Sequence, residues 1–239
     1  MRAVPADKKL RTAATVILLR DSSGGPEVLL LRRNKAVQFA GGMWVFPGGS
    51  LDQEDWDVAE GDEEQAARVA AAREALEESD MLLDPDTLVH LSHWTTPEAE
   101  KKRFYTWFFV ALAPAATDVT IDGSEIHDHE WIGVDAAVKR HEAGDMGFFP
   151  PTIMTLRALR GYLSAEDAVI GVAAQQPPVI FPVIARSEEG FGIMFAGDAG
   201  YESGDADASG ARHRVVMDNG VWRYQYEGNP GVPRLDGGA

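Results

Sequence analysis

The segment ARVAAAREALEESDM, from Ala67 to Met81, constrains the fold more than any other part of this chain. Asp62 is placed to cap a helix that runs to about Ser79, and the first turn is rich in Glu, as the helix dipole prefers. Three glutamates in it follow the i, i+3, i+4 spacing and therefore fall within about 100° of arc. The sequence predicts a helix with one outward stripe of carboxylates, formed by Glu74, Glu77 and Glu78.

These carboxylates repel one another, and each close pair costs roughly 0.2–0.5 kcal/mol. Val69, Ala72 and Leu76 lie on the opposite side of the helix, so we expect that face to pack on the core. A hard divalent cation would reverse the repulsion, because Mg²⁺ and Mn²⁺ prefer carboxylate and water oxygens. The alternative is a solvated acidic face without a ligand.

The surroundings of the stripe favour a metal over the solvated face. The Gly-rich turn FPGG, Phe46 to Gly49, lies upstream, and Arg73 directly precedes the first glutamate of the stripe. Arg73 is placed to hold one carboxylate by a bidentate pair and to aim the others.

The rest of the chain indicates a mixed α/β or α+β core followed by a β-rich extension. Apolar and β-branched runs predict strands at 12–21, 27–33, 43–46, 88–95, 103–113 and 127–134. An acidic loop is expected at 52–64, and helices at 135–144, 148–163 and 165–174. The segment QQPP, which starts at Gln175, suggests a domain boundary. This boundary divides the chain into residues 1–174 and 175–239. In the second part, Asp218-Asn219-Gly220 is a hairpin signal.

Composition narrows the class of protein. There is no Cys, so thiolate metal sites and nucleophiles are excluded. The net charge of -16 argues against duplex nucleic acid as a partner, because binding to phosphates requires Lys and Arg. The N-terminal sequence lacks the apolar run of a signal peptide, and no stretch reaches the roughly 18 apolar residues of a membrane helix. We therefore expect a cytoplasmic protein with neither membrane nor nucleic acid as a partner.

The helical segment resembles the box of the Nudix hydrolases, G-x5-E-x7-R-E-U-x-E-E-x-G-U, where U is aliphatic. REALEESDM, Arg73 to Met81, matches the second half at every specified position except Asp80, where the box has Gly. FPGG resembles the usual entry to the box. The resemblance covers roughly residues 12–163.

The first half of the box departs from the family pattern. Gly49 and Arg73 are 24 positions apart where the box has 14, so about ten residues are inserted. The candidates for the first Glu of the box are Asp55, Glu64 and Gln65. The lengthened box resembles the branch that includes peroxisomal-type coenzyme A diphosphatases, as do TTPEAEKKRFYTWFFVA, EIHDHEW and FFPPTIMTL.

The resemblance implies an α/β/α sandwich in which the carboxylate helix lies on a mixed sheet. It also implies Mg²⁺ or Mn²⁺ as cofactor and hydrolysis of a diphosphate bond, for which metals supply charge neutralisation and an aligned water. Arg73 would orient the ligands, and Gly48 and Gly49 would let backbone approach metal and phosphate. The implied metal ligands are Glu74, Glu77 and Glu78, with Glu77 and Glu78 also counted as catalytic.

The general base stays open. In many relatives a Glu or Asp lies just before a Trp on a late loop, which here is EIHDHEW. Glu125 and Asp128 are the candidates, as base or as a further metal ligand, and neutral imidazole also suits a base near pH 7. The other candidates are His127, His129, Glu77 and Glu78, and the alternative is a polar loop without chemistry.

The sequence matches a substrate-binding motif of relatives in part. Coenzyme A-specific relatives show L-L-T-x-R-[SA]-x3-R-x3-G-x3-F-P-G-G, and in LLLRRNKAVQFAGGMWVFPGG Arg33 and Gly42 are in register. The departures from that motif are Leu31, Asn34 and Gln38. The residues placed to meet phosphates are Arg32, Arg33 and Lys35, unless they are solvated charges at the end of a strand.

Other side chains are candidates for substrate contact. Arg103 begins the strongest predicted strand and is expected to contact the substrate. The aromatic residues that could stack a base are Trp44, Trp94, Phe104 and Trp107, although aromatic residues in strands more often build core. His213, Arg214 and Arg223 carry no assigned role.

The leading interpretation is a Nudix-type diphosphatase acting on a small molecule, with coenzyme A or its esters ahead of NADH and ADP-sugars. The second is a Nudix-fold sensor or scaffold with little turnover. A nucleic-acid decapping enzyme is disfavoured, because the sequence has no dense Lys/Arg run. Assembly as a homodimer stays open.

Overall fold

The computed structural model describes residues 10–34, 41–114, 118–121, 123–187 and 190–237. Within them the chain forms a main sheet of eight strands and a second sheet of four. The main sheet contains β1 (Leu10–Ser22), β2 (Gly25–Arg33), β3 (Trp44–Val45), β4 (Gly48–Ser50), β5 (Val89–Thr95), β6 (Arg103–Leu112), β7 (Ile126–Gly133) and β8 (Val179–Ile180).

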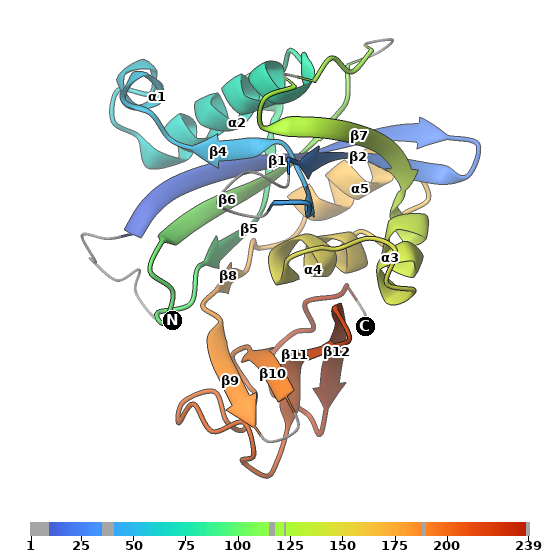
Figure 1. Ribbon diagram of the computed structural model, residues 1–239. Helices are drawn as coiled ribbons and strands as arrows, with labels where there is room; N and C mark the ends of the chain where they lie inside the picture. The colour runs from blue at the N-terminus through green and yellow to red at the C-terminus, as the bar shows by residue number, and fades with distance from the viewer. Residues whose placement is uncertain (1–9, 35–40, 115–117, 122, 188–189, 238–239) are drawn as a thin grey trace.

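β1 is the central strand of the main sheet (Figure 1). It pairs in parallel with β6 from Leu10 to Leu19, and antiparallel with β2 and β4. The strand order is β3-β2-β1-β6-β5-β8, with β4 on β1 and β7 on β2 beside this path. Seven consecutive residues of β1, 13–19, are buried, which is the pattern of a strand covered on both faces.

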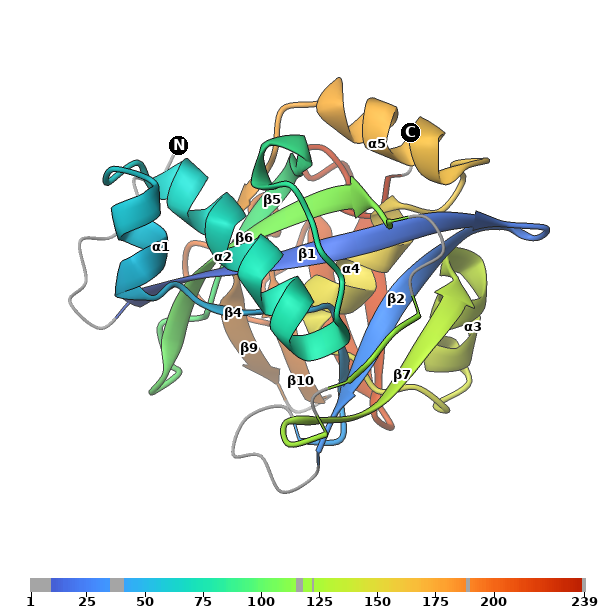
Figure 2. The same ribbon diagram turned by 90° about the horizontal axis from the view of Figure 1, so that it is seen from above.

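Helices cover both faces of the main sheet (Figures 1 and 2). α2 (Glu63–Ser79) lies on one face beside α1 (Gln53–Val58), and the other face carries α3 (Val134–Glu142), α4 (Pro150–Ala158) and α5 (Ala165–Ala173). Alternate residues of β6 enter two separate cores: Trp107 faces α2, whereas Phe108 faces the other three helices. The α/β/α layers predicted for residues before 175 are confirmed.

The second sheet forms the β-rich extension that the sequence predicts. Its strands are β9 (Val183–Ser187), β10 (Gly190–Met194), β11 (Arg212–Asp218) and β12 (Val221–Glu227), in the order β12-β11-β10-β9. The β11–β12 hairpin turns at Asn219 and Gly220, both with positive φ, as the Asn-Gly signal predicts.

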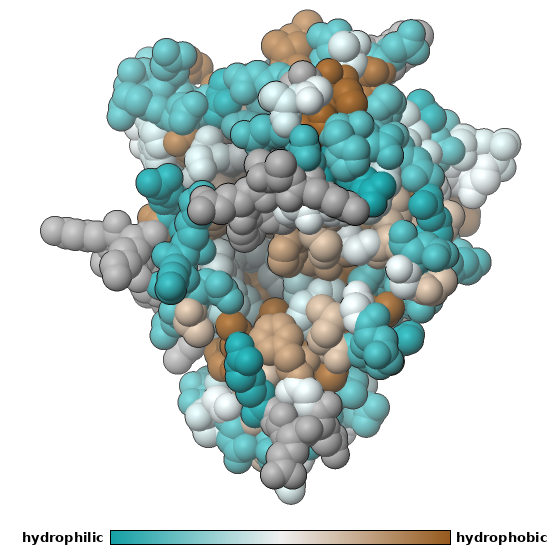
Figure 3. Space-filling view, viewed as in Figure 1, coloured by the Kyte–Doolittle hydropathy of each residue, from teal (hydrophilic) through white to brown (hydrophobic). Residues whose placement is uncertain are grey.

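The second sheet packs on the main body beneath α4 (Figure 1). Phe195 and Val215 join the core formed by α3, α4 and α5. Trp222 donates its backbone N–H to His141 Nε2 at 2.9 Å and its indole N–H to the Phe148 carbonyl at 3.1 Å. Figure 3 shows hydrophobic residues gathered on this face where the two parts meet. The division at residue 175 stays a prediction, and β8, just beyond it, still pairs with β5.

The acidic loop predicted at 52–64 is wrong in part, because residues Gln53–Val58 form α1. Asp55 accepts the backbone N–H of Asp52 at 2.8 Å, the reciprocal contact of a capping box. The acidic residues therefore start a helix here. Among the described residues, no helix is long and apolar enough to cross a membrane.

Candidate active site

α2 begins and ends where the sequence indicates. Asp62 accepts the backbone N–H of Gln65 at 2.8 Å, and Ser79 is the last helical residue. Asp80 follows with φ 59° and ψ 26°, a left-handed conformation that Gly adopts freely and Asp tolerates. The position where the family box has Gly thus requires a left-handed backbone conformation. Asp80 adopts this conformation, and the helix still ends at Ser79.

Replacing Asp80 with Gly tests this requirement. We expect Asp80→Gly to raise the free energy of unfolding by about 0.5 kcal/mol, since Gly has no Cβ to strain. The β-branched Asp80→Val should lower it by about 1 kcal/mol or more. Urea denaturation of both variants is the measurement. Equal stability of the two variants would contradict the account.

The buried face of α2 differs from the predicted one. The residues packed on the sheet are small: Ala67, Ala70, Ala71 and Ala75. Leu76 is 43% exposed and Val69 is half-buried, so of the predicted face only Ala72 is buried. Small side chains let the helix approach the sheet closely. This orientation turns Glu78 inward, and it is only 7% exposed.

Glu78 is held by the backbone of β4. Gly48 donates its N–H to Glu78 Oε2 at 3.0 Å. A Cβ at residue 48 would lie 2.4 Å from the Ala14 carbonyl oxygen, so only Gly lets β4 pair this closely with β1. Burial raises the pKa of Glu78 to about 8, with a further rise from Glu74, while the Gly48 N–H opposes the shift. Without a cation, Glu78 prefers to keep its proton at neutral pH.

Glu74 and Glu77 complete the group of carboxylates. A Cβ at residue 49 would lie 2.3 Å from Glu74 Oε1, so Gly49 leaves the space that this carboxylate fills. Burial raises the pKa of Glu74, and Arg73 opposes the rise. Arg73 Nη1 donates to Glu74 Oε1 at 2.9 Å and to Glu77 Oε2 at 3.3 Å. The side chain of Glu77 is 58% exposed, so the three carboxylates run from buried to solvent-facing.

Arg73 is itself fixed by Asp55. Its Nε and Nη2 donate to the two Asp55 oxygens at 3.1 and 2.9 Å, and Nη2 also donates to the Ser50 carbonyl at 3.2 Å. The hydrogen bond to Asp55 is the largest of the causes that raise the pKa of Arg73. Asp55 lies six positions after Gly49, where the box has its first Glu.

Of the three candidates for that first Glu, the structure therefore brings Asp55 to Arg73. Glu64 instead pairs with Arg68 at 2.6 Å, and Gln65 donates to Asp86 at 3.0 Å. The residues inserted into the box lie between Asp55 and Arg73, in the end of α1, its following turn and the first part of α2.

Removing the charge of Asp55 should loosen this arrangement. Asp55 is 2% exposed, so Asp55→Asn leaves the Arg73 guanidinium without its bidentate partner. We expect a loss of about 2–3 kcal/mol in the free energy of unfolding and a fall in turnover. Asp52→Asn is the matched control, because Asp52 is exposed and 3.9 Å from Arg73, and it should cost under about 0.5 kcal/mol. Urea denaturation measures both, and equal losses would refute the role of Asp55.

Glu125 and Arg33 approach Glu78 from the other side. β2 and β7 pair next to them, and Arg33 Nη2 lies 2.5 Å from Glu125 Oε2. Arg33 lowers the pKa of Glu78 and Glu125 raises it, so both charges act on that carboxylate. The Glu125 side chain is 57% exposed. The structure thus brings the predicted Glu125 and Arg33 to the predicted carboxylates.

The remaining candidates lie elsewhere on the sheet. On β7, Asp128 and His127 are exposed and His129 is half-buried. Arg103 is buried at the start of β6, where its Nε donates to the Thr96 carbonyl at 3.3 Å. The aromatic residues Trp44, Trp94 and Trp107 belong to the hydrophobic cores, which favours the core role, and Phe104 is half-buried. Lys35 and Gln38 lie outside the described residues.

The donor set fits a hard divalent cation, although no three His, Asp or Glu side chains of the described part are gathered closely enough to hold one as they stand. The donors are all oxygens, as Mg²⁺ and Mn²⁺ prefer. Gly48 and Gly49 keep side chains out of the space beside Glu74 and Glu78. Glu78 is buried as a carboxylate whose charge a cation would compensate.

These features, on a helix over a mixed sheet, can be compared with known proteins. A family model described as NUDIX domain matches residues 9–150. The chain belongs to this family. The match ends where α4 begins, so α5 and the second sheet lie beyond it.

Two relatives illustrate the extent of the similarity. A Caenorhabditis elegans protein named "Putative nudix hydrolase 7" is 27% identical over 184 residues, which cover 62% of this chain and 60% of the relative. The chain thus spans less than two thirds of that relative's length. The crystal structure of a NUDIX hydrolase from Alicyclobacillus acidocaldarius is 26% identical with a TM-score of 0.61, covering 67% of this chain and 96% of the other.

Proposed function

We propose that this protein is a metal-dependent hydrolase that cleaves the diphosphate bond between a nucleoside and another group. The observation that carries the proposal is the buried carboxylate of Glu78, held by the Gly48 N–H beside Glu74 and Glu77. Burial raises the pKa of such a carboxylate because its negative charge is unfavourable there. A bound cation displaces the proton and compensates the charge, so a buried carboxylate of this kind suits a metal site. The family membership supports the reaction class.

Mg²⁺ or Mn²⁺, held by Glu74, Glu77 and Glu78, would neutralise the diphosphate and align water for attack on phosphorus. Arg73 keeps two of these carboxylates in place while Asp55 fixes Arg73. Gly49 leaves the space that the Glu74 carboxylate fills, and Gly48 lets β4 donate its backbone N–H to Glu78, so both glycines place the carboxylates that would hold the metal and, with it, the phosphate.

Glu125 and Arg33 have complementary roles in the proposal. The exposed carboxylate of Glu125 accepts the proton of the attacking water as general base. Arg33 orients Glu125 and offers its remaining N–H groups to a substrate phosphate. In support, Arg33 is close enough to Glu78 to lower the pKa of that carboxylate. Arg103 is a second candidate for substrate contact.

Coenzyme A or an ester of it is the first candidate substrate, because Arg33 and Gly42 keep the register of the coenzyme A motif and the box is lengthened. NADH and ADP-sugars are the next candidates. We assign residues 1–174 to the Nudix domain and 175–239 to the extension, and we place the protein in the cytoplasm. A measurement of molecular mass in solution would show whether the protein forms a homodimer.

A substrate panel tests the proposal. Product analysis with Mg²⁺ or Mn²⁺ would cover coenzyme A, acyl-coenzyme A, NADH, ADP-ribose, diadenosine polyphosphates and deoxynucleoside triphosphates, each beside Glu77→Gln. We expect metal-dependent cleavage of coenzyme A that the variant lacks. Cleavage of another member would correct the substrate but keep the reaction. If none of the compounds is cleaved, the proposed hydrolase activity is wrong.

The alternative is a catalytically weak Nudix-fold sensor or scaffold. One observation favours it: Arg73 already neutralises Glu74 and Glu77 without a metal. A sensor would bind a nucleotide without Mg²⁺, and Glu77→Gln would leave that affinity unchanged. Calorimetric titration of ADP-ribose with and without Mg²⁺ separates the two functions.

A further inference from the structure

The peptide group between Pro47 and Gly48 is held at both of its ends. Its N–H, from Gly48, donates to Glu78 Oε2 at 3.0 Å. Its carbonyl oxygen, from Pro47, accepts the Thr15 hydroxyl at 2.6 Å and the backbone N–H of Val16 at 3.0 Å. A trans peptide group is planar, and its N–H and C=O point in opposite directions, so contacts at the oxygen fix the direction of the N–H. The direction of the Gly48 N–H towards Glu78 is therefore set from β1.

The backbone of Gly48 does not hold this orientation by its own conformational preference. Gly has no Cβ and adopts a wide range of φ, so rotation of the peptide group beside it meets little steric resistance. The pairing of β4 with β1 nevertheless requires Gly here, because a Cβ would lie 2.4 Å from the Ala14 carbonyl oxygen. The Thr15 hydroxyl thus supplies a restraint that Gly48 itself lacks.

The contact between Thr15 and Pro47 is shielded from water. Thr15 is 8% exposed, and Pro47 is buried. A carbonyl oxygen has two lone pairs, and the Thr15 hydroxyl and the Val16 N–H supply one donor for each. Because hydrogen bonds in series polarise one another, the donors at the Pro47 oxygen also strengthen the Gly48 N–H as a donor. Thr15 therefore acts on Glu78 through one peptide group.

We propose that Thr15 is a positioning residue of the metal site, where it acts through the Pro47–Gly48 peptide group to hold the Glu78 carboxylate in place for a divalent cation. The side-chain hydrogen bond of Thr15 goes to the backbone of Pro47 and not to a carboxylate. The inference rests on the proposed function, in which Glu78 is a metal ligand. Loss of the hydroxyl should weaken metal binding although it removes no ligand.

Binding of Mn²⁺ at neutral pH, followed by electron paramagnetic resonance, tests this role without a substrate. Thr15→Val removes the hydroxyl and keeps the β-branched shape of the side chain. We expect its dissociation constant for Mn²⁺ to rise about threefold to tenfold, the effect of one neutral hydrogen bond. Thr15→Ser keeps the hydroxyl and should bind Mn²⁺ within about twofold of the wild type.

The order of the two variants separates positioning from stability. Ser favours a strand less than Val does, so a purely structural role would make Thr15→Ser at least as damaging as Thr15→Val. The amide signal of Gly48 in the NMR spectrum of the metal-free protein is a second readout. It should move upfield in Thr15→Val, because the hydrogen bond to Glu78 lengthens, and stay near the wild-type position in Thr15→Ser.

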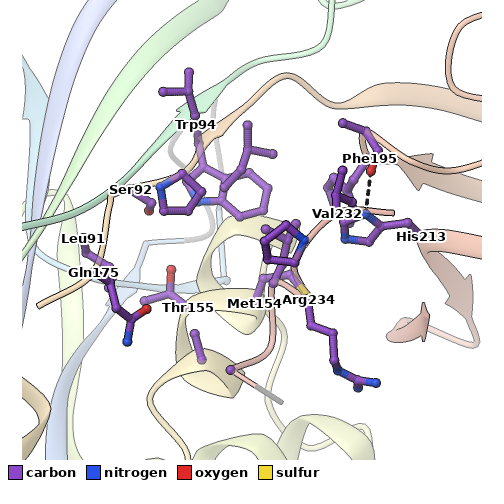
Figure 4. A pocket seen from close by; sticks show the side chains of 18 of the residues that line it. Leu91, Ser92, Trp94, Met154, Thr155, Gln175, Phe195, His213, Val232 and Arg234 are labelled. Atoms are coloured by element: carbon purple, nitrogen blue, oxygen red, sulfur yellow. Dashed lines mark hydrogen bonds between the residues drawn. The ribbon is translucent and has the colours of Figure 1, made fainter. Parts of the chain in front are cut away.

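Thr155→Val is the matched control. Thr155 is also buried, at 4% exposed, but it lies on α4 and lines the cavity between the main body and the second sheet (Figure 4). α4 and α2 pack on opposite faces of the main sheet. The same substitution there should leave both the Mn²⁺ affinity and the Gly48 amide signal as in the wild type.

Two results would contradict the proposal: equal Mn²⁺ affinity of Thr15→Val and the wild type, or an equal loss of affinity in Thr15→Val and Thr15→Ser. If the wild type itself binds no Mn²⁺, the proposed metal-dependent function is wrong. The Gly48 amide signal then decides whether Thr15 places Glu78. A signal that moves only in Thr15→Val would support this role, and a signal unchanged in Thr15→Val would refute it.

Discussion

Glu77→Gln should lower turnover of the diphosphate substrate at least about 100-fold, while the melting temperature in metal-free buffer changes little. Loss of one charged ligand removes transition-state stabilisation of several kcal/mol, and 100-fold corresponds to about 2.7 kcal/mol. The fold should tolerate the change because the Glu77 side chain is 58% exposed and its ion pair with Arg73, at 3.3 Å, lies at the surface.

Glu54→Gln is the matched control for this experiment. Glu54 is an exposed glutamate in the first turn of α1, outside the group of carboxylates on α2. The same change of charge there should leave turnover within about twofold of the wild type. Steady-state kinetics over a range of Mg²⁺ concentrations is the measurement. Wild-type turnover in Glu77→Gln at saturating Mg²⁺ would refute the assignment of Glu77 as a metal ligand.

The features predicted correctly from the sequence are those with a local cause. Asp62 caps α2 with its own side chain, and the Asn219-Gly220 turn needs two positive φ angles that these residues adopt readily. The strand predicted at 103–113 is likewise found, as β6 from Arg103 to Leu112, because its aromatic and β-branched residues favour an extended backbone. Such features depend on a few neighbouring residues.

The predicted buried face of α2 is wrong for Val69 and Leu76, which were expected to pack on the core opposite the glutamates. Leu76 is more apolar than any alanine of the helix, yet Leu76 faces solvent and Ala71 is buried. What decides the orientation is the close approach of the helix to β1, which excludes larger side chains. That constraint lies in the partner strand, and a helical pattern taken alone does not contain it.

The pairing of Asp55 with Arg73 also depends on distant residues. The insertion changes the spacing within the box, so the sequence left Asp55, Glu64 and Gln65 as alternatives. The spacing of six residues from Gly49 was the signal that could have selected Asp55. The contact between Trp222 and His141 had no such signal, because it forms only when the second sheet packs against the main body.

The second large effect should come from Glu78→Gln, which we expect to stabilise the protein in metal-free buffer at high pH. The pKa of Glu78 is about 8 in the folded state against an ordinary 4.5. Because the folded state binds the proton more tightly, this group favours folding below pH 4.5, and that contribution is lost as pH rises through about 8. Each pKa unit corresponds to about 1.4 kcal/mol, so the charged carboxylate costs roughly 3–5 kcal/mol.

Gln keeps an oxygen that can accept the Gly48 N–H but carries no charge, so it avoids this cost. With EDTA, the melting temperature of Glu78→Gln should exceed that of the wild type by at least about 5 °C at pH 9, and the gap should shrink towards pH 6. Mg²⁺ should close the gap at pH 9 by stabilising only the wild type, because the cation compensates the buried charge that the variant lacks. Glu54→Gln controls for the change in net charge. If the difference in melting temperature does not depend on pH, the titration of Glu78 is not its cause. If Mg²⁺ does not change the difference, Glu78 is not a metal ligand.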